Sequence, residues 1–459
     1  MSDQLRVARR TVLQGALAGG ALLTAAACSS GTPDTPTGEP TSPENPFGVT
    51  ANAPLEVVPG LEYGGYGAEA YRKKYAQATV MANPTAQLRD VLQPRFAAGS
   101  PPDVVHDTGA KTLAVGRLVA EDQLTDLQMV LDAPAWDASG TKVQDTLIPG
   151  ILDTGRYEGT LRDLNYIATV YGIWYSTQLF EKYNWEAPRT WPELLAVATE
   201  MKARGLGPFA YAGTHPYYVF EPILTLAAKT GGMDVVKRID NLEDGAWKDK
   251  SLTRALTAFG ELFRRGLIAK GSAALDHTAS QTRLMTSKVG LLPCGNWLEN
   301  EMGATIPKDF GLTVIGVPAL DNSAALPRGL HVAPTAPFMV PAKAKNRPGG
   351  LEYLRAMLSR EVAAKVSAET NQLTVVRGAA DGLEISTALR SARDLLTAAG
   401  DQTITWYFAD WYPELGKAAG DITGEFLAGA FRAEEWTNRM QRAADKVKQD
   451  KSVAKFHRD

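Results

Sequence analysis

The strongest constraint on the fold is an alternation of short apolar segments with amphipathic helical segments early in the chain. The apolar segments 55–59, 78–83 and 101–107 predict three strands. Residues 69–76 and 83–99 predict the helices between them, because apolar side chains recur at helical spacing. Strands that alternate with helices form βαβ units, so we expect an α/β fold with a parallel sheet.

The loops that follow these strands are the first candidates for a ligand site. In parallel sheets, ligands bind outside the carboxyl ends of the strands. The stretch EYGGYG, residues 62–67, follows the first strand, but a dinucleotide motif would need glycine where Ala70 stands. We therefore expect a neutral loop that approaches the ligand closely, with Glu62 and Tyr66 as its contacting side chains. Asp107 ends the third strand.

Later segments continue the mixture of strands and helices. Residues 166–176 predict a strand, and residues 190–205 predict a helix with Thr190 as its N-cap and Glu193 completing a capping box. The stretches 289–297, 336–346 and 372–378 read as extended, 350–367 as a helix, and the C-terminal remainder as helical. The folded part is longer than one core usually covers, so we expect two domains.

The first residues have the pattern of an export signal. Arg9 and Arg10 precede an apolar run that extends to Ala27 and is rich in alanine and glycine. These features indicate a secretory signal over residues 1–27, and paired arginines are typical of the twin-arginine route. A transmembrane anchor is the alternative, but the run is short for a bilayer and has few large apolar side chains.

Composition limits what can follow the signal. Residues 28–54 are mainly Ser, Thr, Pro, Gly and acidic residues, so we expect a disordered tether. The net charge of −3 gives no basic excess to attract nucleic acid. The chain has two cysteines, Cys28 and Cys294. Cys294 lies in an apolar run, so we expect a buried thiol rather than a disulfide.

Five stretches, taken in order, carry a family resemblance. They are EYGGYG, PDVVHD, YGIWYS, GNWLENE and PFMVPAKAKN with the following GGLEYLRAMLS. In these the chain resembles the extracellular solute-binding proteins of ABC importers, in their carbohydrate-binding branch. GNWLENEM and FMVPAKAKN are similar to actinobacterial lipoproteins that bind N-acetylglucosamine and chitobiose. The small-residue run before Cys28 resembles a lipobox, which implies that Cys28 is the lipid-bearing first residue of the mature protein.

The resemblance implies a two-lobe α/β fold of the type II periplasmic-binding-protein class, with a hinge and a sugar in the cleft between the lobes. One lobe takes residues 55–170 and 338–372, and the other takes 171–337 and 373–459. It also implies a monomer that is lipid-anchored at the extracytoplasmic face of the cell membrane, delivers a small carbohydrate to ABC permease subunits, and needs no cofactor.

A sugar presents hydroxyls and apolar C–H faces, so its site needs aromatic platforms with carboxylate and amide groups. Trp297 follows an apolar strand on a glycine-containing loop, and residues 405–415 bring Trp406, Tyr407, Trp411 and Tyr412 together around Asp410. A core position is the alternative for each aromatic residue, and a solvated loop for each polar one. The predicted ligand contacts are Glu62, Tyr66, Asp107, Tyr166, His215, Tyr217, Asn296, Trp297, Glu299, Trp406, Asp410 and Trp411.

An enzyme is the rival class. A glycosidase needs two carboxylates on either side of the scissile bond, and no spacing singles out such a pair. The chain has no G-x-S-x-G nucleophile motif. Its five histidines do not form a zinc motif. We therefore expect no catalysis and no metal, and we keep cellobiose, xylobiose and maltose as alternative ligands of a binding protein.

Overall fold

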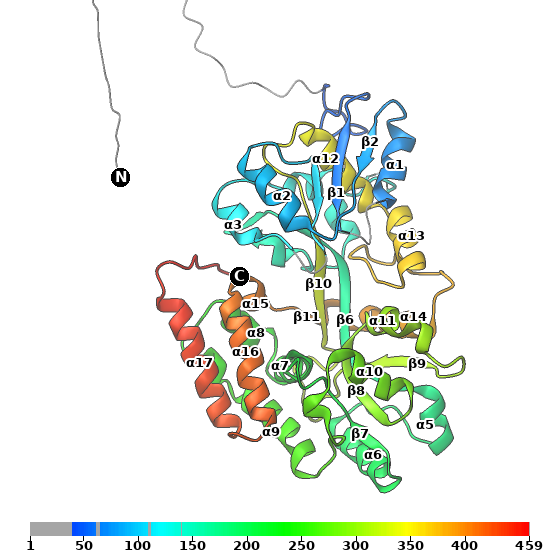
Figure 1. Cartoon of the computed structure of the whole chain (residues 1–459), viewed down its shortest axis with the longest axis vertical. Helices are drawn as coiled ribbons and strands as arrows, with labels where there is room; N and C mark the ends of the chain where they lie inside the picture. Colours follow the sequence, from blue (N-terminus) through cyan, green and yellow to red (C-terminus); the bar gives the residue numbers. More distant parts are fainter. Residues whose placement is uncertain (1–38, 61–64, 109–111, 139, 459) are drawn as a thin grey trace, which may run out of the picture. The chain divides into compact units, whose positions relative to one another are not determined.

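The computed structural model describes residues 39–60, 65–108, 112–138 and 140–458. One nine-stranded sheet runs through this part in the order β2-β1-β3-β10-β6-β8-β7, with β11 beside β10 and β9 beside β6. Figure 1 shows two of these strands, β6 and β10, as long neighbouring arrows with α1, α2 and α12 beyond one end and α6, α7 and α9 beyond the other. The predicted mixed α/β fold is confirmed.

The first three strands form the predicted βαβ units. Strand β1 is parallel to β2, with Leu55 opposite Val80, and parallel to β3, with Val57 opposite Val104. The helices α1 and α2 connect them. The elements are β1 (Leu55–Pro59), α1 (Tyr66–Lys74), β2 (Val80–Ala82), α2 (Leu88–Ala97), β3 (Val104–His106), α3 (Val115–Ala120) and α4 (Gln128–Asp132).

The parallel pairing predicted from the first three strands is confirmed for those strands, and the sheet as a whole is mixed. Strand β10 (Leu330–Met339) returns from the far end of the chain and lies between β3 and β6 (Leu164–Ser176), antiparallel to both. No strand–helix–strand unit joins β10 directly to β3 or β6, so the βαβ argument does not fix its direction. The hairpin β4 (Arg156–Tyr157) and β5 (Thr160–Leu161) stands apart as its own small sheet.

The second half of β6 carries the rest of the sheet. It pairs antiparallel with β8 on one side and with β9 on the other. Helix α6 begins as predicted, since the Thr190 hydroxyl accepts from the Glu193 amide and the Glu193 carboxylate accepts from the Thr190 amide. The elements are α5 (Thr177–Tyr183), α6 (Trp191–Ala203), β7 (Gly207–Phe209), α7 (Tyr217–Gly231), α8 (Met233–Asp240), α9 (Lys250–Arg264), α10 (His277–Met285), β8 (Val289–Gly295), α11 (Leu298–Met302) and β9 (Leu312–Ile315).

The C-terminal part is helical, apart from the short strand β11. The helix predicted over 350–367 is divided in two, because the Ser359 hydroxyl accepts from the Val362 amide and starts a new helix. Helices α16 and α17 pack with α7 and α9 in one buried cluster. The elements are α12 (Arg347–Met357), α13 (Arg360–Thr370), α14 (Thr387–Ala399), β11 (Thr403–Ile404), α15 (Phe408–Trp411), α16 (Pro413–Leu427) and α17 (Ala433–Gln449).

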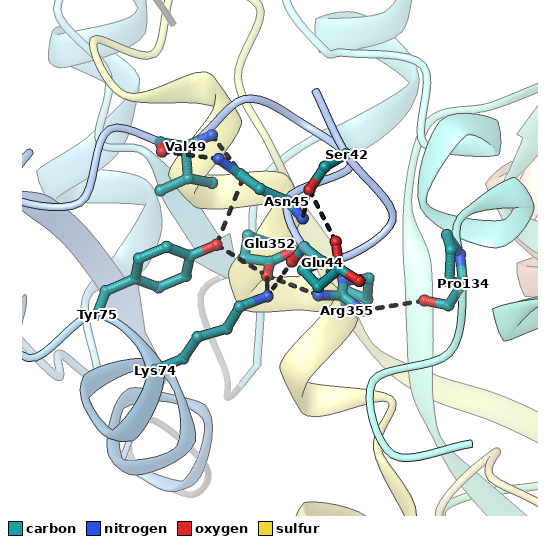
Figure 2. A network of polar contacts seen from close by, with 9 residues as sticks. All are labelled: Ser42, Glu44, Asn45, Val49, Lys74, Tyr75, Pro134, Glu352 and Arg355. Atoms are coloured by element: carbon teal, nitrogen blue, oxygen red, sulfur yellow. Dashed lines mark hydrogen bonds and ion pairs between the residues drawn. The ribbon is translucent and has the colours of Figure 1, made fainter. Parts of the chain in front are cut away.

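The predicted disordered tether is wrong for its last residues, because these pack against the folded part. Val49 has no exposed surface, and its amide donates to Asn45 at 2.8 Å. Figure 2 shows this segment above a buried carboxylate, that of Glu352, which accepts from Lys74 and Tyr75. The composition of this segment predicted disorder because the segment contains few apolar residues. One of these few, Val49, is nevertheless buried in the core.

Two further findings concern the sequence expectations. Cys294 is a buried free thiol, as predicted. In the part of the chain that the structure describes, no helix has the length and apolar character needed to cross a membrane.

Candidate functional site

A cleft of about 1240 Å³ opens along strands β6 and β10, in the middle of the sheet. Asn165, Ile167 and Thr169 of β6 and residues 334–337 of β10 line its floor. One wall follows the carboxyl end of β3, from Asp107 onward, as expected for a sheet of this kind. The other wall comes from the loop after β8, from α15 and from the C-terminal tail.

Aromatic side chains stand along this second wall. Trp297 lines the cleft and packs edge-on against Tyr171 and Tyr218, with ring centroids 5.2 and 6.1 Å apart. Gly295 makes room for it, since a Cβ there would lie 2.0 Å from the indole. Trp411 lines the cleft beside Phe456, with centroids 5.6 Å apart. The cleft thus offers flat apolar faces to a ring-shaped ligand.

Two polar atoms of the cleft are buried without a hydrogen-bond partner among the described residues. They are the hydroxyl of Thr108 and the indole N–H of Trp411. Leaving a buried donor or acceptor unpaired costs about 1–3 kcal/mol. A ligand hydroxyl at either atom would recover that cost, so these two atoms mark positions where a polyol can bind.

The cleft is acidic. Five carboxylates line it, against one cation among the described lining residues. Asp107 is buried, its carboxylate accepts from the Leu113 amide at 3.0 Å, and burial raises its pKa to about 6. The acidic residues are Asp107, Asp163, Glu301, Glu369 and Asp410, and the cation is Arg117.

Asp163 is the carboxylate that the cleft perturbs most. It is 4% exposed and accepts from the Asn165 side chain at 3.2 Å. Burial, and then the charge of Asp410, raises the pKa of Asp163 to about 7. Asp410 itself is exposed within the cleft, on α15. Near neutral pH the cleft therefore holds a proton that a carboxyl group in water would lose.

This shift predicts a pH dependence of stability. The folded pKa of Asp163 lies above the unfolded value of about 3.9, so its stabilising contribution is present below about pH 3.9 and is lost as the pH rises through about 7. We expect Asp163→Asn to raise the melting temperature relative to the parent protein, increasingly from about pH 5 to about pH 8. Thermal unfolding of both proteins across this range checks it, and a constant difference would contradict it.

The structure brings four of the predicted contacts together in the cleft: Asp107, Trp297, Asp410 and Trp411. Tyr66 lies close to the cleft residue Glu369. Burial, and then the interaction with Glu369, raises the pKa of Tyr66. Glu62 lies outside the described residues, so its predicted contact stays a prediction.

Three predicted contacts lie behind the cleft rather than in its described lining. Tyr166 has no exposed surface and donates to the Met357 carbonyl at 2.9 Å. The Asn296 side chain is buried and accepts from the Val170 amide at 3.2 Å. Trp406 is buried and stacks on His331 with ring centroids 3.6 Å apart. In this structure these side chains support the walls.

The remaining predicted contacts also lie outside the described lining. Glu299 accepts from the Ser386 hydroxyl at 2.8 Å, and burial raises its pKa. His215 and Tyr217 lie edge-on, with ring centroids 6.3 Å apart, at the start of α7. Tyr217 also packs on Tyr218, which contacts Trp297, so this loop supports the Trp297 wall from behind.

Several residues of the cleft were missed by reasoning from the sequence. Asp163 and Asn165 stand at the start of β6, and polar residues next to a buried strand were the available signal. Thr108 follows Asp107 directly and shares its position at the end of β3. Phe456 had no such signal, because it belongs to a short C-terminal tail without regular structure.

Fold and cleft together define a two-lobe binding protein for a solute. Residues 61–364 match the family described as bacterial extracellular solute-binding protein, and the chain belongs to this family. Its members are binding proteins and not enzymes, which agrees with the expectation from the sequence.

Individual relatives show which proteins the chain is similar to. It is 34% identical to the diacetylchitobiose binding protein NgcE of Streptomyces coelicolor, with 97% of each chain covered. The apo form of RafE from Streptococcus pneumoniae superposes with a TM-score of 0.69 at 16% identity, covering 86% of this chain and 98% of that one. A chitin oligosaccharide binding protein superposes with a TM-score of 0.58 at 18% identity, covering 80% and 90%. These structural likenesses show the shared fold.

Proposed function

We propose that the chain is the extracellular sugar-capturing component of an ABC importer, and that its ligand is diacetylchitobiose or N-acetylglucosamine. The observation that carries the proposal is the joint presence of Trp297, Trp411 and Phe456 with several carboxylates in one cleft. Aromatic faces stack on pyranose rings, and carboxylates accept hydrogen bonds from hydroxyl groups. The relationship to NgcE supports the choice of sugar.

The charge of the cleft supports a neutral ligand. Those of its carboxylates that are ionised would repel a phosphorylated or acidic sugar, because like charges disfavour one another in a poorly solvated site. They would accept from hydroxyls and from the acetamide N–H of N-acetylglucosamine. Thr108 and Trp411 supply two further polar atoms that have no partner in the described part of the structure.

Capture would proceed by closure of the two lobes around the hinge. The proposed boundaries are residues 55–170 with 338–372 for one lobe, and 171–337 with 373–459 for the other. Two features of the sheet support them. Val170 pairs with β10, whereas Tyr171 pairs with β8. Strand β10 contacts β3 through Phe338 and Met339. The closed, loaded protein would then dock on the permease.

A ligand panel on the soluble part, residues 39–459, tests the proposal. We expect diacetylchitobiose to raise the melting temperature, because a ligand present at about 100 times its Kd stabilises the folded state by about 2.7 kcal/mol. The panel includes N-acetylglucosamine, cellobiose, xylobiose and maltose, and isothermal titration gives the affinity of each sugar that shifts the transition.

The panel also separates the alternatives. A shift with cellobiose, xylobiose or maltose but not with diacetylchitobiose would retain a sugar-binding protein and reject the proposed ligand. No shift with any of the five would reject the sugar proposal as a whole. Release of a chromophore from a chromogenic disaccharide by the purified protein would favour the enzyme instead.

We further propose that the protein works as a monomer held at the outer face of the membrane by a lipid on Cys28, after export by a twin-arginine signal. Cys28 lies outside the described residues, so this part rests on the sequence and on the extracellular family. Fractionation of cells that express the parent chain or Cys28→Ser tests it. Equal membrane association of the two proteins would contradict the anchor.

A further inference from the structure

A second cavity, of about 550 Å³, lies away from the cleft and shares no described lining residue with it. It is bounded by the loop after α5, the end of β9, the start of β10 and helix α14, all labelled in Figure 1. The apolar residues Ile315, Val317, Leu330 and Leu395 form much of its surface.

One buried lysine distinguishes this cavity. Lys229, in the last turn of α7, lines the cavity and is 5% exposed. Its stem packs under Gly329, where a Cβ would lie 2.8 Å from Lys229 Cγ. No described residue accepts a hydrogen bond from the ammonium group or forms an ion pair with it, and loss of hydration lowers its pKa to about 8.

A buried ammonium group needs compensation. Burying an unpaired charge is costly, and proteins nearly always pair such groups or bind an ion beside them. The carbonyl end of α7, which ends at Gly231, supplies only partial negative charge. The helix end alone therefore does not supply a full counter-charge for Lys229.

Two exposed arginine residues also line this cavity. Arg189 and Arg328 line the same cavity, and neither side chain has an ion pair among the described residues. Their loops are held through the backbone, since the Arg189 amide donates to Glu193 at 2.7 Å and the Arg328 amide donates to Gln402 at 2.9 Å. Glu186 is the one acidic residue in the described lining, so cations outnumber it three to one.

We propose that this cavity binds a small oxyanion, of the phosphate, sulfate or carboxylate class. The planar guanidinium group of arginine binds such anions with two hydrogen bonds. The ammonium group of Lys229 adds a positive charge, and its apolar surrounding strengthens the attraction between this charge and the anion. The sugar cleft, in contrast, is acidic, so the two sites select ligands of different charge. The site is independent of the sugar ligand proposed above.

Titration of the purified protein with inorganic phosphate tests the proposal. Melting temperature and heat of binding are measured at constant ionic strength, with sodium chloride as the balancing salt. We expect a saturable response in the parent protein, and a loss of phosphate affinity of at least tenfold, or about 1.4 kcal/mol, in Lys229→Met. Lys417→Met, which removes an exposed lysine outside the cavity, is the matched control and keeps the parent affinity.

Three additional measurements distinguish the proposal from its alternatives. Arg328→Gln serves as a second variant in case Lys229→Met folds poorly, and diacetylchitobiose binding by both variants checks the cleft separately. Vesicles that contain phosphatidylglycerol distinguish a lipid headgroup from a free anion. A response to phosphate no larger than the response to chloride, or parent-like phosphate affinity in both cavity variants, would overturn the proposal.

Discussion

We expect Trp297→Ala to weaken the binding of the proposed ligand, diacetylchitobiose, about 30-fold, because truncating an aromatic anchor at a binding site typically costs about 2 kcal/mol or more. Trp297 has two roles in the structure. It lines the cleft, and it packs edge-on against Tyr171 and Tyr218. Only the first of these contributes to stacking on a sugar. Isothermal titration of parent and variant measures the change.

The matched control is Trp185→Ala. Trp185 is also a partly buried aromatic residue, it stacks on Tyr183 with ring centroids 4.7 Å apart, and it lies outside the cleft lining. We expect parent-like sugar affinity in this control. Unchanged affinity in Trp297→Ala, together with a lowered melting temperature, would show that Trp297 is a core residue and would remove it from the site.

The second large effect concerns stability. We expect Glu352→Ala to lower the free energy of unfolding by about 3–5 kcal/mol, because it leaves the buried guanidinium of Arg355 without its counter-charge. The Glu352 carboxylate has no exposed surface and accepts two hydrogen bonds from Arg355, each 2.7 Å long, and one of 2.7 Å from Lys74 (Figure 2). The Tyr75 hydroxyl donates to it as well, at 3.1 Å.

Urea unfolding of the parent, of Glu352→Ala and of Lys417→Ala measures this effect. Lys417 pairs with Asp421 on the exposed surface of α16, where an ion pair contributes little. We expect the unfolding midpoint of Lys417→Ala to stay close to that of the parent. A small shift of the unfolding midpoint in both variants would contradict the prediction. It would mean that water or a rearranged side chain compensates the positive charges next to residue 352.

The sequence predicted the parts of the fold that rest on local patterns. The strands and helices from β1 to β3 follow from their apolar spacing, and the start of α6 follows from the capping box of Thr190 and Glu193. The place of β10 between β3 and β6 did not follow, because that pairing joins segments far apart in the chain. The end of the predicted tether failed similarly, since Val49 is ordered by contacts with distant residues.

The cleft was predictable only in part, for a related reason. Trp406 and Trp411 stand in one aromatic run, yet Trp406 stacks on His331 in the core and Trp411 lines the cleft. Core and sugar platform both select aromatic residues, so composition cannot separate them. Phe456 reaches the cleft because its amide donates to the Tyr412 hydroxyl at 3.0 Å and Arg458 pairs with Asp240 at 2.7 Å. No periodic pattern in the sequence predicts such long-range contacts.

The central position of β10 also bears on how the protein is made. Residues 55–176 leave the ribosome with β3 and β6 already present, but the strand that joins these two is synthesised only after most of the chain has been completed. Until then the facing edges of β3 and β6 have unpaired backbone groups, which attract other strands. Nascent protein that stalls before β10 therefore presents two open edges and is at risk of aggregation.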